Sequence, residues 1–485
     1  MNGPAPTPRA RRVAVVGGGI TGLAAAHRLI ELDPACQVRL FEAGNRLGGV
    51  LHSERQDDFL LEFGADNFIT NVPWALDLCR RVGLADQLLH TNSGRRRALV
   101  VRDGRLHPVP EGFMVMEPRA LWPLVLSPLL SWRGKARVLG EYFVAARRDV
   151  KDESLASFAT RRLGREAFER LVQPLAAGIY TADPEQLSLA ATMPRFLEME
   201  RQHGGLIRAV RHSKSAGAGQ GESGARYSLF VAPRDGMQAL ATATAARLPP
   251  ETVRLNTRVS GLRRRPEGGW EITVAGAAAP EESREEFDAV ILALPAHRAA
   301  TLVQPVDDSL GSALGAIPYA SSAVAILTYR QSQLARPPDG FGIVVPDVER
   351  RPMLAASFTS VKFTHRAPPG WTIVRVFFGG AARPELVSAS DEELFTTAQT
   401  QMAELIGARG EPGLRRVERW HRAMPQYHLG HLERVADIRD RVARLPGLEL
   451  AGNAYEGVGV PLCIKSGEAA AERILDAKLD RKEQA

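Results

Sequence analysis

The chain has 485 residues, of which 45% are hydrophobic and 24% are charged, with a formal net charge of +7. This length exceeds a single hydrophobic core and predicts two or three lobes. Basic and acidic residues are interspersed, so the excess charge favours small acidic ligands or an anionic membrane surface and argues against nucleic acid. Cys36, Cys79 and Cys463 form no C-x-x-C pair, which argues against a disulfide framework or zinc site and indicates a reducing compartment.

The segment 13–22 predicts a turn that binds a dinucleotide. Residues 13–16 form an apolar run suited to a buried strand, and residues 23–30 continue as a helix rich in alanine and leucine. The turn between them reads G-x-G-x-x-G, whose glycines permit a tight turn, close approach of a pyrophosphate and packing of helix on strand. A second strand, 37–41, ends at Glu42, where the ribose of such a cofactor would lie. A glycine turn alone joins many strands to helices, but these features together favour the dinucleotide.

Apolar spacing and turn residues predict the remaining elements. Helices are expected over 74–82, 155–163, 166–175, 194–200, 391–405 and 464–475. Strands are expected over 227–231, 253–255, 270–274, 287–294, 323–329, 341–345, 372–378 and 448–453. Helical spacing over about 115–215 predicts an inserted helical lobe, and the small polar residues 213–225 predict a surface loop. The strands within 320–380 are expected to form a separate sheet.

Residues 120–132 are the best candidate for membrane contact. The run is too short to span a bilayer and contains two prolines. Trp122, Trp132 and the basic residues at 133–137 suit an anchor that enters one leaflet. The alternative is an internal pair of helices that lines a ligand cavity, because apolar runs of this length are commonly core. The sequence leaves both alternatives open.

The strand at 448–453 leads through Gly457 and Gly459 into the final helix. Such a strand–glycine–helix connection is routine when it stands alone. Together with the turn at 13–22 it predicts that two distant helix starts hold one extended cofactor. One start would bind the pyrophosphate and the other would lie beside a flavin ring.

Four segments of the chain resemble a known family. Residues 42–49, Glu-Ala-Gly-Asn-Arg-Leu-Gly-Gly, are similar to a motif of the flavin-containing amine oxidase and phytoene desaturase superfamily. Residues 178–188, 425–431 and 452–460, in this order, resemble the oxygen-dependent protoporphyrinogen oxidase family, including its coproporphyrinogen-oxidising bacterial members. The resemblance covers essentially the whole chain after Arg12.

The resemblance implies non-covalent FAD and a mixed α/β (α+β) fold. Its expected parts are a Rossmann-like FAD domain of the p-hydroxybenzoate-hydroxylase type, a sheet-based substrate domain and a helical membrane-facing lobe. The predicted boundaries are a disordered N-terminus at 1–12, a discontinuous FAD domain at 13–90, 227–310 and 415–485, the helical lobe at 91–215 and the substrate sheet at 311–414.

The resemblance also implies a reaction of late haem biosynthesis. Hydride leaves a meso carbon of a porphyrinogen for flavin N5, protons leave the pyrrole nitrogens, and molecular oxygen reoxidises the flavin with release of hydrogen peroxide. Three such cycles give the porphyrin. Because the flavin carries the chemistry, the protein chiefly positions the macrocycle.

Cofactor contacts are implied residue by residue. Glu42 binds the adenosine ribose, Arg46 compensates charge near the phosphates, and the backbone of Val259 pairs with adenine. Ala65 stands where the family has proline, which loosens the local turn without removing the contact. Trp420 either lies beside the flavin or is a core aromatic. The full predicted set is Gly17, Gly18, Gly19, Ile20, Thr21, Gly22, Glu42, Ala43, Arg46, Gly49, Gly64, Ala65, Asp66, Asn67, Val259, Trp420, Val458, Gly459 and Val460.

The implied substrate is a flat apolar ring with propionates, which needs apolar walls and a cation at the rim. Arg97 matches the family's carboxylate-binding position, although a basic run can equally be a solvated turn. The remaining predicted contacts, each of which could instead be ordinary core, are Gly178, Phe341, Gly342, Val344 and Phe377. No catalytic side chain or metal site is expected, and Cys463 is either near the site or simple packing.

The sequence leaves the substrate as protoporphyrinogen IX or coproporphyrinogen III, which differ in two vinyl groups against two extra propionates. The expected partners are the porphyrinogen, molecular oxygen and, at most, a peripheral membrane contact, with no nucleic acid. A cytoplasmic monomer or homodimer is expected. The alternatives are another flavin amine oxidase or carotenoid desaturase, or a membrane-associated flavin-binding protein without turnover.

Overall fold

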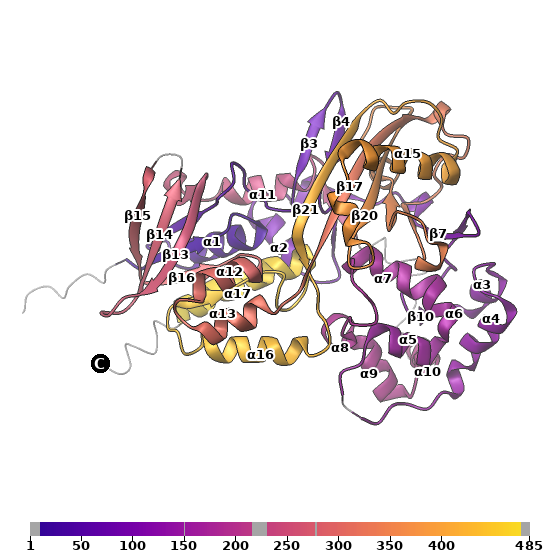
Figure 1. Cartoon of the computed structure of the whole chain (residues 1–485), viewed down its shortest axis with the longest axis horizontal. Coiled ribbons are helices and arrows are strands. Elements are labelled where there is room, and N and C mark those ends of the chain that lie inside the picture. The colour runs from indigo at the N-terminus through magenta and orange to yellow at the C-terminus, as the bar shows by residue number, and fades with distance from the viewer. Residues whose placement is uncertain (1–9, 150, 216–229, 277–278, 477–485) are drawn as a thin grey trace, which may run out of the picture.

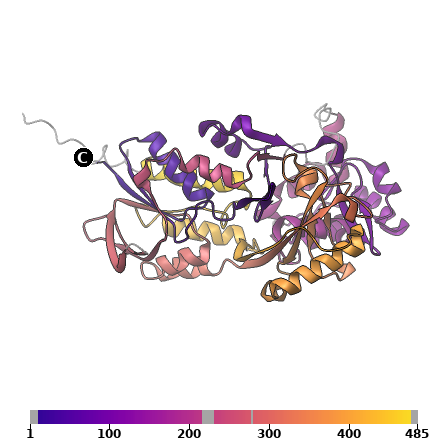
Figure 2. The same cartoon turned by 90° about the horizontal axis from the view of Figure 1, so that it is seen from above.

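The computed structural model describes residues 10–149, 151–215, 230–276 and 279–476. Its elements form three regions: one built on a parallel sheet, one on a larger mixed sheet, and one that is mainly helical (Figure 1). Seen from above, the first and last helices of the chain lie at the end opposite the helical region (Figure 2).

The first region is built on a five-stranded parallel sheet with the order β12–β2–β1–β16–β22. The strands are β1 (Arg12–Val16), β2 (Gln37–Phe41), β12 (Val253–Arg254), β16 (Ala289–Leu292) and β22 (Leu448–Leu450). On one face, Val13 and Val15 of β1 pack with α1 (Ile20–Leu32), α11 (Gln238–Ala245) and α17 (Val460–Asp476). Covering of both faces explains why residues 13–16 of β1 are all apolar.

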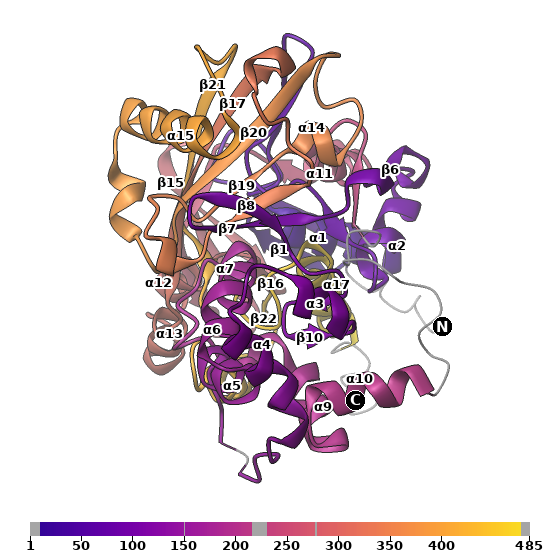
Figure 3. The same cartoon turned by 90° about the vertical axis from the view of Figure 1, so that its right-hand side faces the viewer.

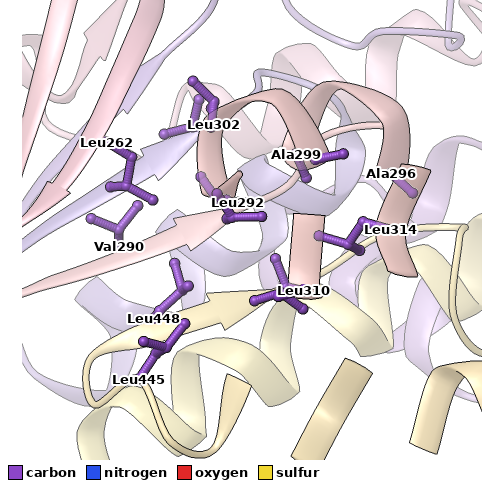
Figure 4. Close-up of a cluster of buried hydrophobic side chains, with 14 of the residues drawn as sticks. Leu262, Val290, Leu292, Ala296, Ala299, Leu302, Leu310, Leu314, Leu445 and Leu448 are labelled. Carbon is purple, nitrogen blue, oxygen red and sulfur yellow. The ribbon is translucent and has the colours of Figure 1, made fainter. Parts of the chain in front are cut away.

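The other face of this sheet is covered by a second layer. The layer consists of β13 (Thr257–Arg264), β14 (Trp270–Gly276), β15 (Ala279–Phe287), α12 (Ala296–Val303), α13 (Asp308–Gly315) and α16 (His431–Val442). Leu292 of β16 points into a core with Ala299 of α12, Leu310 of α13 and Leu448 of β22 (Figure 4). This core fixes the sheet, so its carboxyl edge presents a stable ligand-binding position.

The second region is a seven-stranded sheet with the order β21–β17–β20–β19–β18–β7–β8. Its strands are β7 (Ala98–Arg102), β8 (Arg105–Pro108), β17 (Tyr319–Arg330), β18 (Gly342–Val344), β19 (Ala355–Ser357), β20 (Trp371–Gly379) and β21 (Arg415–Pro425). The helix α15 (Asp391–Ile406) buries its apolar side on this sheet, and the short α14 (Thr359–Lys362) precedes β20. Smaller strands join the two sheets: β3 (Ser53–Gln56), β4 (Phe59–Glu62), β5 (Phe68–Ile69), β6 (Leu88–His90) and β11 (Phe230–Pro233), with α2 (Trp74–Arg81) beside them.

The third region is mainly helical and lies below the seven-stranded sheet (Figures 1 and 3). Its elements are β9 (Phe113–Met114), β10 (Glu117–Pro118), α3 (Leu121–Leu126), α4 (Trp132–Leu139), α5 (Leu155–Leu163), α6 (Arg165–Ala167), α7 (Gln173–Tyr180), α8 (Leu189–Thr192), α9 (Pro194–His203) and α10 (Leu206–Ser215). Arg162 is fully buried here and pairs with Glu141 and Glu200. Within the described ranges, no helix is both long and apolar enough to cross a membrane.

Two predicted elements agree with the structure to the residue, the strand 37–41 and the helix 155–163. The predicted helix 166–175 is instead interrupted by a π-helical turn, Phe168–Val172, after which α7 continues to Tyr180. Gly178 therefore lies inside a helix, beyond the predicted helix end. The predicted loop 213–225 is wrong at its start, because residues 213–215 end α10, and its remainder lies outside the described residues, as do 227–229 and 1–9.

The three-part division of the chain remains a prediction, but sheet membership bears on two of its boundaries. The strands β7 and β8 fall in the stretch assigned to the helical lobe, and β21 falls in the stretch assigned to the FAD domain. All three strands hydrogen-bond within the seven-stranded sheet, where β7 pairs with β18 and β21 pairs with β17. Residues 98–108 and 415–425 accordingly belong with that sheet.

Candidate cofactor and substrate site

The glycine-rich turn lies between β1 and α1, at the carboxyl edge of the parallel sheet. A Cβ on Gly22 would lie 1.9 Å from the carbonyl oxygen of Gly17, so only glycine allows α1 to pack on this turn. A Cβ on Gly19 would meet no atom within 4 Å, so open space lies before the first turn of α1. Because backbone N–H groups at a helix start bind anions, this cradle fits the pyrophosphate of a dinucleotide.

Glu42 lies at the end of β2, against the same turn. Its carboxylate accepts hydrogen bonds from two backbone N–H groups, one of them that of Gly18 at 2.7 Å. The N–H of Gly48 donates to the carbonyl of Gly18 at 2.8 Å, and Arg46 donates to the carbonyl of Gly49 at 2.7 Å. The segment 42–49 is thus folded onto the cradle, and the carboxylate oxygens keep lone pairs for a ribose hydroxyl.

Val259 lies near Glu42, at the carboxyl end of β2. The N–H of Thr257 donates to the carbonyl of Glu42 at 2.8 Å, which joins the start of β13 to this end. Two residues further on, Val259 pairs through its backbone with Val274 of β14. Glu42 and Val259, the two residues predicted to contact the adenosine, therefore lie on segments that a backbone hydrogen bond joins.

The N-terminus of α17 packs beside that of α1. A Cβ on Gly467 would lie 2.1 Å from the carbonyl oxygen of Thr21, which shows how closely the two helices approach. The thiol of Cys463 donates to the carbonyl of Val458 at 3.9 Å, and burial raises its pKa to about 12. Cys463 is therefore a packing residue rather than a nucleophile, and residues 458–460 lead into the helix beside the cradle.

The segment 64–67 follows β4 and is fixed by the second region. Trp420 of β21 donates its indole N–H to the carbonyl of Phe63 at 2.9 Å, and its half-buried ring lies beside this segment. Arg375 of β20 donates to the carbonyl of Gly64. The large sheet therefore positions the segment predicted to lie near the flavin.

A cavity of about 1580 Å³ lies where the three regions meet. From the predicted cofactor set its wall includes Asn67, Val458, Gly459 and Val460, and from the predicted substrate set it includes Arg97, Gly178 and Val344. A Cβ on Gly178 would lie 3.7 Å from Cγ1 of Val344, so α7 and β18 form adjoining walls. Phe341, Gly342 and Phe377 are not among the described residues of this wall.

The charged residues of the cavity wall are mostly cations. They are Arg96, Arg97 and Arg195 against Glu111 and Glu456. The Nη1 of Arg97 lies 3.2 Å from the carboxylate of Asp339, and 47% of its side chain is exposed. Much of the remaining wall is apolar, and the described residues contain no cluster suited to a metal ion. The cavity therefore fits a large apolar molecule that carries anionic groups.

Tyr427 is a wall residue whose role the sequence did not reveal. Its hydroxyl donates to the carbonyl of Asn453 and accepts a hydrogen bond from the N–H of Gly457 at 2.7 Å. Its ring stacks on His431, with centroids 4.0 Å apart. The motif at 425–431 includes Tyr427, but the sequence did not indicate that its hydroxyl fixes the loop before α17.

Residues 20–475 match the flavin containing amine oxidoreductase family. The chain belongs to this family. Coproporphyrinogen III oxidase of Bacillus subtilis (strain 168) is 31% identical, covering 95% of this chain and 97% of the relative, and that of Propionibacterium freudenreichii is 34% identical, covering 98% and 93%. Protoporphyrinogen oxidase 2 of Arabidopsis thaliana is 29% identical, covering 96% and 94%.

Solved structures support the same assignment. A crystal structure from Exiguobacterium sp. 255-15 matches with a TM-score of 0.84 at 30% identity, covering 96% of this chain and 98% of that one. Reduced UDP-galactopyranose mutase, with a TM-score of 0.72 at 16% identity, shares the fold. The protein is a flavin-dependent oxidoreductase, and the predicted fold class, FAD cofactor and family resemblance are confirmed.

Two glycine variants separate cofactor binding from folding. We expect Gly19→Ala to purify with less than half of the wild-type FAD, because its methyl group would occupy the open space of the cradle, while its apoprotein melts at the temperature of the wild-type apoprotein. Gly22→Ala should lower the melting temperature, since its methyl group meets backbone. Absorbance at 450 nm and thermal unfolding measure the two effects. A Gly19→Ala protein with full FAD content would contradict the proposed cradle.

Burial lowers the pKa of His431 from 6.5 to about 4. The unfolded chain therefore binds a proton that the folded chain does not between these pH values, and the free energy of unfolding decreases as the pH falls from about 6.5 to 4. His431→Phe keeps a ring against Tyr427 and should reduce this slope by about 1.4 kcal/mol per pH unit. Urea unfolding at several pH values measures the slope. Equal slopes for the two proteins would show that His431 does not titrate as described.

Proposed function

We propose that this protein oxidises a porphyrinogen to the porphyrin in late haem biosynthesis, with FAD as the oxidant and molecular oxygen as the final acceptor. The observation that carries the proposal is the cavity wall, which extends from the first turn of α17 to Arg97 and Arg195. Its volume of about 1580 Å³ accommodates a tetrapyrrole beside a cofactor ring. Relatives named coproporphyrinogen III oxidase and protoporphyrinogen oxidase support the same reaction.

The role of the protein in this reaction is to bind and orient the cofactor and the substrate. The turn at 17–22 and Glu42 would hold the pyrophosphate and ribose, and the segments 64–67 and 458–460 would hold the flavin end at the cavity. When bound, FAD accepts a hydride from a substrate carbon. The apolar wall would fix the macrocycle in one orientation and exclude water, and correct orientation alone can supply much of a rate enhancement.

The charges of the cavity favour coproporphyrinogen III as the substrate. Coproporphyrinogen III carries four propionates, whereas protoporphyrinogen IX carries two. Arg96, Arg97 and Arg195 outnumber Glu111 and Glu456 on the wall by one, and this excess positive charge favours the substrate with more carboxylates, with which guanidinium groups pair well. The same cations disfavour a protonated amine, which is the substrate of an amine oxidase.

We also propose a peripheral contact with a membrane through α3, α4 and the turn that follows them. Trp122, Leu126, Trp132 and Phe143 lie in this stretch and are between 73% and 82% exposed. The guanidinium of Arg133 lies 5.6 Å from the ring of Trp132, so basic and aromatic groups are presented together. Leu126 also lines the cavity. The stretch 120–132 would therefore both contact the membrane and line the ligand cavity, the two roles that the sequence left open. Aromatic and basic residues of this kind favour an anionic bilayer surface.

The reaction is tested on the purified holoprotein. Anaerobic addition of coproporphyrinogen III should bleach the flavin absorbance, and air should restore it with formation of peroxide and fluorescent porphyrin. Protoporphyrinogen IX, measured in parallel, should give a lower kcat/KM. Arg195→Ala should raise KM for coproporphyrinogen III roughly tenfold with a smaller change in kcat, because pairing with a carboxylate is similar in the ground and transition states.

The matched control is Arg284→Ala, since Arg284 is exposed on β15 and does not line the cavity. It should leave both kinetic constants unchanged. Absence of flavin bleaching with either porphyrinogen would refute the proposed reaction, and equal kcat/KM values would refute the preference for coproporphyrinogen III.

Membrane contact is tested by co-sedimentation with vesicles that contain phosphatidylglycerol. Replacing Trp122 and Trp132 together with Ala should weaken binding roughly tenfold or more, because both side chains would bury apolar area in the bilayer. Leu255→Ala, which removes another exposed apolar side chain from a different region, serves as the control. Binding that is unchanged by the double substitution would exclude this surface.

A further inference from the structure

A buried group of five charged side chains lies behind the cavity wall. Glu62 and Asp66 come from the chain around β4, Lys362 from α14, Arg366 from the turn after it, and Arg375 from β20. Each of these residues is at most 9% exposed. We call this group the basic cluster, because it contains three cations and two carboxylates.

Asp66 is the centre of the basic cluster. The Nζ of Lys362 lies 3.2 and 3.3 Å from its two carboxylate oxygens, and Nη1 of Arg375 lies 3.4 Å from one of them. Nη2 of Arg366 lies 3.8 Å from the carboxylate of Glu62. Burial raises the pKa of Glu62 to about 7, so this carboxylate neutralises less than a full charge at neutral pH. Burial also lowers the pKa of Lys362, and the pairing with Asp66 opposes that shift. With all five side chains ionised, the cluster has an excess of one positive charge, which solvent screens little.

The excess charge needs an explanation beyond stability. Burial of ionic groups costs desolvation free energy, and apolar residues of similar size are often as stable or more stable in their place. The other charged groups that interact with Arg366 from outside the cluster are Arg55 and Asp235, which cancel in sign. The cluster thus retains a net charge at a cost in stability.

Three contacts connect the basic cluster to the candidate flavin site. Arg375 donates to the carbonyl of Gly64, and the side-chain amide of Asn67 donates to Asp66. Asn67 lines the cavity, and so does Phe230, whose ring centroid lies 5.6 Å from Nζ of Lys362. The excess charge is therefore one layer of residues behind the wall, next to the segment 64–67.

We propose that Lys362 is a positioning residue for redox chemistry, whose charge, held in place by Asp66, favours the reduced form of the bound cofactor. The inference rests on the proposed placement of the flavin end at 64–67. A hydride carries two electrons and one proton, so its transfer breaks a substrate C–H bond and adds one negative charge to the cofactor. Molecular oxygen then takes the two electrons and, with two protons, becomes hydrogen peroxide. A buried positive charge stabilises the anionic state between these steps.

Two substitutions of opposite charge test the proposal. Lys362→Met removes one positive charge from the basic cluster, and Asp66→Asn removes one negative charge. Over about 10 Å at an effective dielectric constant of about 20, one charge changes an equilibrium roughly tenfold, which is about 30 mV for a two-electron couple. Lys362→Met should lower the midpoint potential of bound FAD by about this amount. Asp66→Asn should raise it when measured at a pH at which Lys362 stays protonated, because Asp66 opposes the lowering of the Lys362 pKa by burial.

Sulfite binding provides a second readout that is independent of turnover. Sulfite adds to flavin N5 and leaves a negative charge on the ring system, so its dissociation constant should rise roughly tenfold in Lys362→Met and fall in Asp66→Asn. Lys362→Arg keeps the charge and should remain close to wild type. Both measurements use holoprotein, with FAD content and absorbance spectrum recorded first.

The direction of the two shifts separates an electrostatic role from a structural one. A purely structural role would shift the midpoint potential of both variants in the same direction, or would shift neither. Either result would overturn the proposal. Arg161→Met is the control, since Arg161 pairs with Glu153 and Glu200 in the helical region and does not line the cavity. If Lys362→Met does not fold, Lys362→Gln and Asp66→Asn make the same comparison. A wild-type protein that retains no FAD would instead refute the proposed function.

Discussion

The close packing of α1 against α17 is the constraint on which the rest of the structure depends. Thr21 and Gly467 are far apart in the chain, yet a single added methyl group at Gly467 would meet the Thr21 carbonyl. Together with the contact between Gly17 and Gly22, this places two helix starts at one edge of the parallel sheet. Helix starts at such an edge favour anionic ligands, so packing of the backbone and binding of the cofactor have the same geometric requirement.

The other two regions lie beside this edge of the parallel sheet and supply the remaining walls of the cavity. The large sheet contributes Trp420 and Arg375, which hold the segment 63–64 by hydrogen bonds to its carbonyls. The helical region contributes α7 and the arginine at the start of α9, so the cavity has walls from all three regions. A charged ligand in this cavity would interact with cations that no single region provides.

The parts of the fold that the sequence predicted are those whose signals are local. The strand 37–41 and the glycine turn depend on neighbouring residues, so the spacing of apolar residues and the glycine motif were sufficient to predict them. The predicted end of the helix 166–175 was wrong, because the π-helical turn at 168–172 changes the helical register and α7 continues to Tyr180. The missed site residues depend on distant contacts. Lys362 lies 296 positions from Asp66, and nothing in the spacing of either segment indicates that they pair.

The chain order of the parallel sheet has a consequence for synthesis of the protein. The strand β22 and the helix α17 belong to the last 40 residues, but β22 pairs with β16 and α17 packs on α1 near the beginning. A growing chain therefore exposes an incomplete sheet edge and only the first of the two helix starts until β22 and α17 have been translated. FAD can meet both helix starts only after α17 has been translated, so it cannot assist folding of the earlier segments.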